Sequence, residues 1–406
     1  MTRVTRVDDV RRSALPESWR ELPFDECVIP SGAVRLPSIP QSEYVSDGSF
    51  PVIDQGAAKF GGFTNSESAV HRSDLPLIVF GDHTRVVKFV DFPFATGADG
   101  TKLIRPNESV VDARFLYFAL RSLRLPSKGY NRHFSKLREQ TFAVPINLEE
   151  QRRISSVLTS LERRCEIEEN RVGALLHLKA ATMAKLFREG LRGEQLRDTE
   201  IGDMPAEWQV RRLGDPDFCS MSAGGTPSRG DVGCFGGSIP WVKSGELADD
   251  ILSGTEEHLS DRGLEASSAK LLPAGTLLIA MYGATAGMTT ILGIPACTNQ
   301  AVCAALPLND SFDPEFLRHY LVQARPRLLA ARHGGAQPNL SQQILKRVLV
   351  PRPPTAEQRE IGSRLAVINE RIRSAIDRRD ELSLLFSSTL YALMTGMVRL
   401  QVLPDA

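Results

Sequence analysis

Glu150-Gln151-Arg152-Arg153-Ile154 returns as Glu357-Gln358-Arg359-Glu360-Ile361, with four of the five residues unchanged. Each copy is expected to open a helix. Asn147 precedes Glu150, and Thr355 precedes Gln358, at the spacing of a capping box, in which two side chains satisfy free N–H groups at a helix start. A chain that repeats a segment at about half its length usually repeats a structural unit. The sequence therefore predicts two copies of one architecture.

Further echoes extend the repeat over both halves of the chain. The matching pairs are Pro16-Glu17-Ser18-Trp19 with Pro205-Ala206-Glu207-Trp208, Phe115-Leu116 with Phe316-Leu317, and Val144-Pro145 with Val350-Pro351. The globular segments between them differ. Residues 80–85 read Phe-Gly-Asp-His-Thr-Arg, whereas residues 280–285 read Ala-Met-Tyr-Gly-Ala-Thr, and the second segment is longer. The pattern indicates that the globular segments diverged while the helices were kept.

Each repeated helix is expected to run for about 40 residues, or roughly 60 Å, from near Glu149 to Arg188 and from near Ala356 to Thr395. Apolar residues recur in both at alternating spacings of four and three, which is the pattern of a coiled-coil seam. This seam begins at Ile154 in the first helix and at Ile361 in the second. We predict that the helices pair with each other; the alternative is that each packs separately on its own domain.

The segments between the helices have mixed character. Short apolar runs bounded by Gly, Asp and Pro are expected to be buried strands at residues 77–80, 276–281 and 301–306, and residues 115–122 and 316–323 are expected to be short helices. We therefore expect each globular half to combine α and β structure. The order of the strands does not follow from one sequence.

Composition limits the possible classes of protein. The chain has 406 residues, of which 42% are hydrophobic and 24% charged, as in ordinary globular proteins. Its apolar runs are too short for a membrane span, and its basic N-terminus is not followed by a signal-peptide core, so a cytoplasmic location without membrane contact is expected. The six cysteines lack metal-site spacing and are expected to be reduced packing residues.

The sequence lacks the motifs of enzymes that act on nucleotides or nucleic acids. It contains no phosphate-binding GxxxxGK[ST] loop, no GxGxxG, no Asn/Asp-Pro-Pro-aromatic motif of an amino-methyltransferase, and no acidic residue two positions before a lysine, as in many nucleases. His83 follows Asp82, but a single histidine in a turn is more often a structural hydrogen-bonding group. We expect no catalysis by this chain; the alternative is a nuclease whose motif has diverged beyond recognition.

Positive charge gathers at the same place in both halves. Although acidic and basic residues balance at 49 each, two stretches are strongly basic. They contain Arg114, Arg121, Arg124, Lys128, Arg132, Lys136 and Arg138 in the first half, and Arg318, Arg325, Arg327, Arg332, Lys346, Arg347 and Arg352 in the second. With the nearby amides Asn131, Gln337 and Asn339, they are typical of phosphate contacts around base-reading side chains. A solvated helix face is the alternative.

Five motifs of the second half occur together in the order of a known family. They are Gly225-Thr226-Pro227-Ser228-Arg229, Ile239-Pro240-Trp241-Val242, residues 275–285, Thr298-Asn299-Gln300-Ala301 and residues 335–341. On these motifs the chain resembles, over nearly its full length, the specificity subunit of a type I restriction-modification system. The first half instead shows Gly81-Asp82-His83-Thr84 and Gly97-Ala98-Asp99-Gly100, which are similar to another recognition-domain subgroup of that family.

The resemblance implies an α+β fold. Two α/β target-recognition domains form a pseudo-two-fold repeat, separated by two long helices that make an antiparallel coiled coil. The expected domains are residues 1–147 (N-terminal arm and first recognition domain), 148–193 (central long helix), 194–350 (second recognition domain) and 351–406 (C-terminal long helix and tail).

The resemblance also implies a non-catalytic function. Each recognition domain reads one half of an asymmetric bipartite target in double-stranded DNA. Two modification subunits bring S-adenosylmethionine and flip the target adenine out of the duplex, and restriction subunits bring ATP and Mg²⁺, so no cofactor is expected on this chain. The rival hypothesis is a coiled-coil adaptor with two heads that do not bind DNA.

The resemblance and the basic stretches together indicate site residues. Those expected to bind DNA are Thr64, His83, Thr84, Arg85, Lys102, Asn131 and Arg132 in the first half, and Thr226, Ser228, Arg229, Lys243, Tyr282, Thr285, Asn299, Gln300, Gln337 and Asn339 in the second. Those expected to bind partner subunits are Glu150, Gln151, Glu357 and Gln358.

Overall fold

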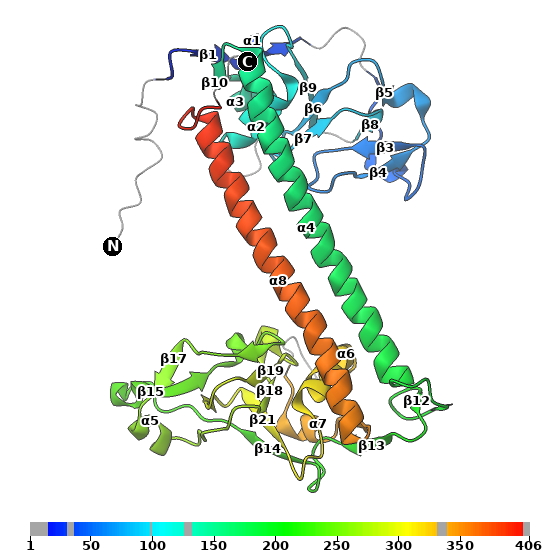
Figure 1. The fold of residues 1–406 in the computed structure, drawn as a ribbon, viewed down its shortest axis with the longest axis vertical. Coiled ribbons are helices and arrows are strands. Elements are labelled where there is room, and N and C mark those ends of the chain that lie inside the picture. The colour runs from blue at the N-terminus through cyan, green and yellow to red at the C-terminus, as the bar shows by residue number, and fades with distance from the viewer. Residues whose placement is uncertain (1–14, 31–35, 98–99, 126–131, 331–338, 401–406) are drawn as a thin grey trace, which may run out of the picture. The chain divides into compact units, whose positions relative to one another are not determined.

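The computed structural model describes residues 15–30, 36–97, 100–125, 132–330 and 339–400 (Figure 1). Of the expected site residues, Asn131 and Gln337 lie outside these ranges. The chain forms two compact units: unit 1 contains residues 1–168 and 378–406, and unit 2 contains residues 169–377. Both boundaries fall inside long helices, so each unit contains a segment of each helix.

The two long helices are confirmed. They are α4 (Leu148–Glu189) and α8 (Thr355–Met394), and Figure 1 shows each as one unbroken ribbon. In unit 1 the predicted seam is buried, because Ile154 and Leu158 at the start of α4 share a core with Phe386 and Leu393 near the end of α8. The beginning of one helix therefore lies along the end of the other.

Unit 2 contains the converse arrangement. Met183 and Leu186 near the end of α4 share a core with Ile361 and Leu365 near the start of α8. The helix segments are thus paired in each unit, as the seam predicts, and antiparallel, as the resemblance implied. The alternative, in which each helix packs separately on its own domain, is wrong.

The described residues in the globular part of unit 1 form three small sheets. Their strand orders are β1-β10, β2-β9-β6-β7 and β4-β3-β8-β5. The strands are β1 (Trp19–Pro23), β2 (Val28–Ile29), β3 (Phe50–Ile53), β4 (Gly62–Thr64), β5 (Val70–His71), β6 (Leu77–Gly81), β7 (Val87–Val90), β8 (Phe94–Thr96), β9 (Thr101–Pro106) and β10 (Thr141–Pro145). The helices are α1 (Phe24–Cys27), α2 (Ala113–Ser122) and α3 (Phe134–Arg138).

Unit 2 has sheets of orders β13-β22, β14-β21-β18-β19-β16 and β17-β15-β20, with a small β11-β12 pair. Its strands are β11 (Leu196–Arg197), β12 (Met204–Pro205), β13 (Gln209–Arg212), β14 (Cys219–Ala223), β15 (Phe235–Val242), β16 (Ile251–Leu252), β17 (Glu257–Leu259), β18 (Leu277–Ala280), β19 (Thr289–Leu292), β20 (Cys297–Thr298), β21 (Val302–Pro307) and β22 (Leu349–Arg352). Its shorter helices are α5 (Asp261–Glu265), α6 (Pro314–Ala330) and α7 (Gln342–Lys346).

The two units share one topology. The order β2-β9-β6-β7 in unit 1 corresponds to β14-β21-β18-β19 in unit 2, and β4-β3-β8 corresponds to β17-β15-β20. Both units contain one parallel pair in the second of these sheets: β3 with β8 in unit 1, and β15 with β20 in unit 2. The structure therefore confirms the repeat in the globular segments, where the sequence motifs differ.

The expected short elements are present. The predicted strands at 77–80, 276–281 and 301–306 are β6, β18 and β21, and the predicted helices are α2 and α6. Each helix begins after an aspartate that accepts a backbone N–H bond at 2.9 Å, Asp112 from Phe115 and Asp313 from Phe316. Helix α6 continues beyond the predicted end to Ala330, with Pro326 inside it.

A buried glutamine joins each long helix to its globular domain. The side-chain oxygen of Gln151 accepts from the Asp112 N–H at 2.6 Å, and that of Gln358 accepts from the Asp313 N–H at 2.9 Å. The side-chain nitrogen of each donates to a proline carbonyl of the preceding connection, at 2.8 and 2.9 Å. One amide thus fixes both the start of the domain's helix and the entry of the chain into the long helix.

The neighbouring glutamate is buried beside a tryptophan in both copies. Trp19 Nε1 donates to Glu150 at 3.2 Å, and Trp208 Nε1 donates to Glu357 at 3.1 Å. The second carboxylate interaction differs: Glu150 binds the Arg399 guanidinium at 2.7 Å, whereas Glu357 accepts from the Leu191 N–H at 3.1 Å. We call these Glu-Gln pairs, with the groups they bind, the helix-start clamps.

Helix α6 is fixed by a buried polar network in unit 2. Arg318 is 1% exposed, donates to the Asp249 carbonyl, and places Nη2 3.1 Å from His319 Nε2. Because a guanidinium only donates, this His319 nitrogen must accept, so the ring is neutral. Burial, together with the charges of Arg318 and Lys179, lowers the pKa of His319 to about 2, although Glu315 lies 3.5 Å away.

No helix within the described residues is long and apolar enough to span a membrane.

The first prediction concerns the clamp in unit 2. Replacing Gln358 with Ala leaves the buried Asp313 N–H and Pro353 carbonyl without their partner, which costs about 1–3 kcal/mol for each group. We expect the free energy of unfolding of unit 2 to fall by about 3 kcal/mol in urea titrations of the full chain. The neighbouring Arg359 is exposed, so Arg359→Ala should change stability by less than about 0.5 kcal/mol. Equal effects of the two variants would contradict this role of Gln358.

The second prediction concerns pH. Because the pKa of His319 is lower in the folded than in the unfolded chain, the unfolded chain binds more protons below about pH 6.5. Stability from this residue is therefore complete above that pH and is lost as the pH falls, by up to about 1.4 kcal/mol per pH unit. Urea titrations between pH 7 and 4.5 should show that His319→Gln loses this component of the slope. His177 is exposed, and His177→Gln should keep the wild-type slope; a wild-type slope in His319→Gln would contradict the account.

Candidate nucleic-acid interface

In unit 2 the predicted site residues gather at the end of the parallel strands β15 and β20. The register pairs Trp241 with Cys297 and Val242 with Thr298, so Lys243 and Asn299 are the next residues on the two strands. The backbone continues the pairing, because the Asn299 N–H donates to the Val242 carbonyl at 2.9 Å. The sheet thereby brings together two motifs that are more than 50 residues apart in sequence.

The loop that carries Thr226, Ser228 and Arg229 is fixed beside these strands. The Trp241 indole is 1% exposed and donates to the Gly225 carbonyl at 3.1 Å, and the Gly225 N–H donates to Thr298 at 2.9 Å. A Cβ on Gly224 would lie 2.1 Å from the Thr298 oxygen, and one on Gly225 would lie 2.5 Å from the Ala269 nitrogen. Both glycines are therefore needed for the close approach.

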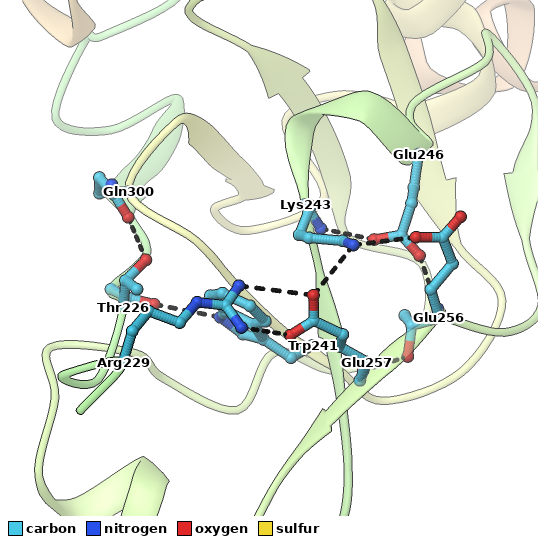
Figure 2. Close-up of polar contacts among 10 residues, drawn as sticks. Thr226, Arg229, Trp241, Lys243, Glu246, Glu256, Glu257 and Gln300 are labelled. Atoms are coloured by element: carbon cyan, nitrogen blue, oxygen red, sulfur yellow. Dashed lines mark hydrogen bonds and ion pairs between the residues drawn. The ribbon is translucent and has the colours of Figure 1, made fainter. Parts of the chain in front are cut away.

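Four charged side chains form a network at this edge (Figure 2). Glu257 binds the Arg229 guanidinium through both oxygens, at 2.7 and 3.4 Å, and also binds the Lys243 ammonium at 3.1 Å. Glu256 binds Lys243 at 2.9 Å. The Arg229 guanidinium carbon lies 4.7 Å from the Phe235 ring centre and 5.2 Å from that of Trp241. The two cations are thus fully matched by two carboxylates.

These contacts stabilise the charged forms. Hydrogen bonds from Arg229 and then Lys243 lower the pKa of Glu257. Hydrogen bonds to Glu256 and Glu257 raise the pKa of Lys243. Glu257 and Lys243 are therefore stabilised in their charged forms.

The backbone around Lys243 is braced by Glu246. Its two carboxylate oxygens accept from the Lys243 N–H at 2.7 Å and from the Glu256 N–H at 2.8 Å. To the other side in Figure 2, the Thr226 hydroxyl donates to the side-chain oxygen of Gln300. The structure therefore brings Thr226, Arg229, Lys243 and Gln300 into one site with Asn299.

The other residues of unit 2 that were expected to bind DNA differ in their surroundings. Ser228 and Asn339 are exposed. Tyr282, which is 40% exposed, precedes the short 3-10 helix Gly283–Thr285 that contains Thr285. The Asn299 side-chain oxygen accepts from the Ala301 N–H at 3.1 Å, which shapes its own turn.

Unit 1 has different chemistry at the equivalent strand ends. The register pairs Ile53 with Thr96, so Asp54 and Gly97 occupy the places of Lys243 and Asn299. Asp54 lies 3.6 Å from the Lys88 ammonium. A carboxylate thus stands where the other unit has an ammonium.

Gln55 connects this strand end to the predicted motif at residues 81–84. The Gln55 side-chain oxygen accepts from the His83 N–H at 3.3 Å, and its backbone carbonyl accepts from the Thr84 hydroxyl at 2.6 Å. A Cβ on Gly100 would lie 2.8 Å from both the Gln55 side-chain oxygen and the His83 ring. His83 and Thr84 therefore lie at the edge that corresponds to the site of unit 2.

The other expected residues of unit 1 are more dispersed. Arg85 has a φ of 63° and donates to the Leu125 carbonyl at 2.7 Å. Lys102 lies on β9 opposite Phe80, and Arg132 is exposed. Thr64 is buried on β4, in the same sheet as β3 and β8, and its hydroxyl oxygen accepts from the Ser66 N–H at 3.2 Å.

A groove of about 940 Å³ runs between α2, the β6–β7 hairpin and α4 in unit 1. Cations outnumber acids among its lining residues, which include Lys59, Arg85, Lys88, Arg114, Arg121, Arg124 and Arg163 with Asp91, Glu162 and Glu166. Arg114 lies over Phe89 and binds Asp91 at 3.0 Å, and Arg121 pairs with Glu162. Part of the first basic stretch is thus neutralised by acids from other segments.

The second basic stretch differs more from expectation. Arg318 is buried and pairs with Glu315 at 2.6 Å, and Arg325 pairs with Asp249 at 2.5 Å. Arg327 donates to the Ile201 carbonyl at 2.9 Å. The expectation of a phosphate clamp is wrong for Arg318, because its guanidinium is enclosed and bound inside unit 2.

The four residues expected to bind partners have internal functions. Glu150, Gln151, Glu357 and Gln358 are each no more than 6% exposed and form the helix-start clamps. Direct contact of these side chains with another subunit stays a prediction.

Sequence reasoning missed Gln55, Glu256 and Glu257. Acidic residues are not expected where a polyanion binds. In addition, the sequence alone does not show the strand register that places Glu257 opposite Trp241. The adjacent acidic residues Glu256 and Glu257 at the start of β17 were the visible signal.

The cysteines are packing residues, as expected. All six are free thiols, and all but Cys165 are buried. Burial raises the pKa of Cys27 to about 11 and that of Cys303 to about 12, which makes these thiols weak nucleophiles. Among the described residues, no group of three or more His, Cys, Asp or Glu side chains has the arrangement of a metal site.

Comparison with known proteins identifies the architecture. Residues 205–382 match the family model of the type I restriction modification DNA specificity domain. The chain is 22% identical to the type I restriction enzyme EcoR124I/EcoR124II specificity subunit of Escherichia coli, over 84% of this chain and 85% of the relative. It is 23% identical to the type I restriction enzyme MjaVIII specificity subunit of Methanocaldococcus jannaschii, over 89% and 85%. Over most of its length the chain is similar to type I restriction-modification specificity subunits.

Two solved structures from type I restriction-modification systems have the same fold. The type I restriction-modification S subunit from M. genitalium superposes with a TM-score of 0.63 at 16% identity, covering 93% of this chain and 96% of that one. A chain from a structural study of complex assembly and conformational transition in a type I system gives 0.53 at 18% identity, covering 95% and 100%. The adaptor hypothesis without DNA is not supported by these relatives.

Proposed function

We propose that this specificity subunit reads an asymmetric, bipartite target in double-stranded DNA, with one half-site for each recognition domain, and performs no catalysis. The observation that carries the asymmetry is the pair of equivalent strand ends. Lys243 and Asn299 in unit 2 correspond to Asp54 and Gly97 in unit 1. The two strand ends therefore organise different sets of hydrogen-bonding side chains, and different donors and acceptors recognise different base edges, so the two domains are suited to different sequences.

We further propose that the chain recruits two modification subunits and, with them, restriction subunits. In this proposal S-adenosylmethionine, ATP and Mg²⁺ are bound by those partners and no cofactor is bound by this chain. A specificity subunit cannot expose an adenine for methylation without an enzyme that flips the base. The relation to a chain from a study of type I complex assembly supports the recruitment.

The third prediction tests whether the domains read separately. Gln300→Ala in unit 2 and His83→Ala in unit 1 each remove an expected base contact from one domain. The chain is co-expressed with the modification subunit of its own system, and methylated adenines are mapped by single-molecule sequencing. Each variant should relax one half-site, by about 5- to 150-fold for a lost specific contact, and leave the other unchanged.

The two variants serve as controls for each other. Both exchange a polar side chain for Ala, but in different domains. A wild-type complex that methylates a continuous or palindromic sequence would contradict the bipartite asymmetric target. Relaxation of both half-sites by either variant would contradict separate reading.

A further inference from the structure

The charged network of unit 2 holds its side chains in fixed positions, which phosphate binding alone does not require. The cross-strand register places Glu257 opposite Trp241, and Lys243 follows Trp241 by two residues on the same strand. Arg229 reaches Glu257 from the loop held by the Trp241 indole. Figure 2 shows the arginine and lysine side chains converging on this one carboxylate from different segments.

Arg229 is fixed in plane and direction although its side chain is 57% exposed. Two of its N–H groups face Glu257, and its guanidinium lies near the Phe235 and Trp241 rings. A guanidinium has five N–H donors in one plane. Those not facing Glu257 are therefore held in a fixed direction for another acceptor.

The charge balance argues against a simple phosphate contact. DNA affinity from phosphate contacts depends on unbalanced cations that release counterions. Arg229 and Lys243 are matched by Glu256 and Glu257. An ion-paired network adds little to that release, so its contribution is better explained as specificity.

The same contacts determine which side chain of the network can contact a DNA base. Both oxygens of Glu257 are bound by cations, which leaves it poorly placed to accept from cytosine. Lys243 is held by two carboxylates. Arg229 remains the exposed member with directed donors, and a fork of arginine donors matches the O6 and N7 acceptors of guanine.

We propose that Arg229 reads a guanine in the half-site of the second recognition domain, and that Glu257 is the positioning residue that aligns the Arg229 guanidinium. Lys243 binds the same carboxylate at 3.1 Å and helps to hold it in place. This inference rests on the proposed function, because it names the base class that one of the two domains reads.

The test compares four variants of the full chain, co-expressed with its modification subunits, by mapping methylated adenines. Glu257→Gln should lower the preference for guanine at one position of one half-site by about tenfold. Arg229→Ala and Arg229→Lys should relax the same position, since neither retains the fork. Glu265→Gln is the matched control: this exposed glutamate of α5 belongs to the same unit but not to the charged network, so the motif should not change.

Two further measurements separate positioning from folding or phosphate binding. The melting temperature of the complex should stay near wild type, and Glu257→Asp should restore part of the guanine preference. The salt dependence of binding to a duplex carrying the mapped target should be nearly unchanged in Arg229→Ala, whereas loss of a phosphate contact would lower its slope by about one.

The inference is overturned if Glu257→Gln retains the full preference, or if it relaxes a position other than the one relaxed by Arg229→Lys. It is also overturned if Glu257→Gln tightens binding to all sequences with a steeper salt dependence, which would indicate phosphate contact. A wild-type complex without any methylated motif would instead refute the proposed function.

Discussion

Two buried amides, Gln151 and Gln358, hold the architecture together. Each closes hydrogen bonds to the start of a domain helix and to the connection that enters a long helix. A buried amide without partners is costly, so the geometry tolerates little change. The globular segment between the fixed points is free to diverge as long as it returns an aspartate N–H to the same place. This constraint explains why the helix starts repeat in sequence while the recognition segments do not.

Much of the fold could be predicted because the repeat and the seam are local patterns. The long helices, their pairing and the strands β6, β18 and β21 follow from local patterns, whereas the antiparallel orientation of the helices was implied by the family resemblance. The strand order did not follow, because the parallel pairs join segments that are distant in sequence. Burial also reversed one expectation: Arg318 belongs to a basic stretch, but its partners come from the same helix and from Asp249.

The candidate site was predicted in part for the same reason. Motifs located Thr226, Arg229, Lys243 and Gln300, yet the acids that organise them come from the start of another strand. In unit 1 the loop at His83 is fixed by Gln55, which no motif marked. A sequence shows which side chains are chemically suited to DNA, whereas the sheet register determines which of them meet. Recognition in each domain therefore depends on the side chains at the strand ends. The helix-start clamps attach both domains to the long helices in the same way.

The most direct test of this account is to exchange one recognition segment while keeping both clamps. In such a chain, residues 20–145 replace residues 209–351, so that Trp208, Glu357 and Gln358 receive the strands and Asp112 of the first domain. Methylated adenines are then mapped in cells that also carry the modification subunit. The account predicts a bipartite target whose two halves have the same sequence, that of the original first half-site. Persistence of the original asymmetric target would contradict the claim that the segments between the clamps carry specificity.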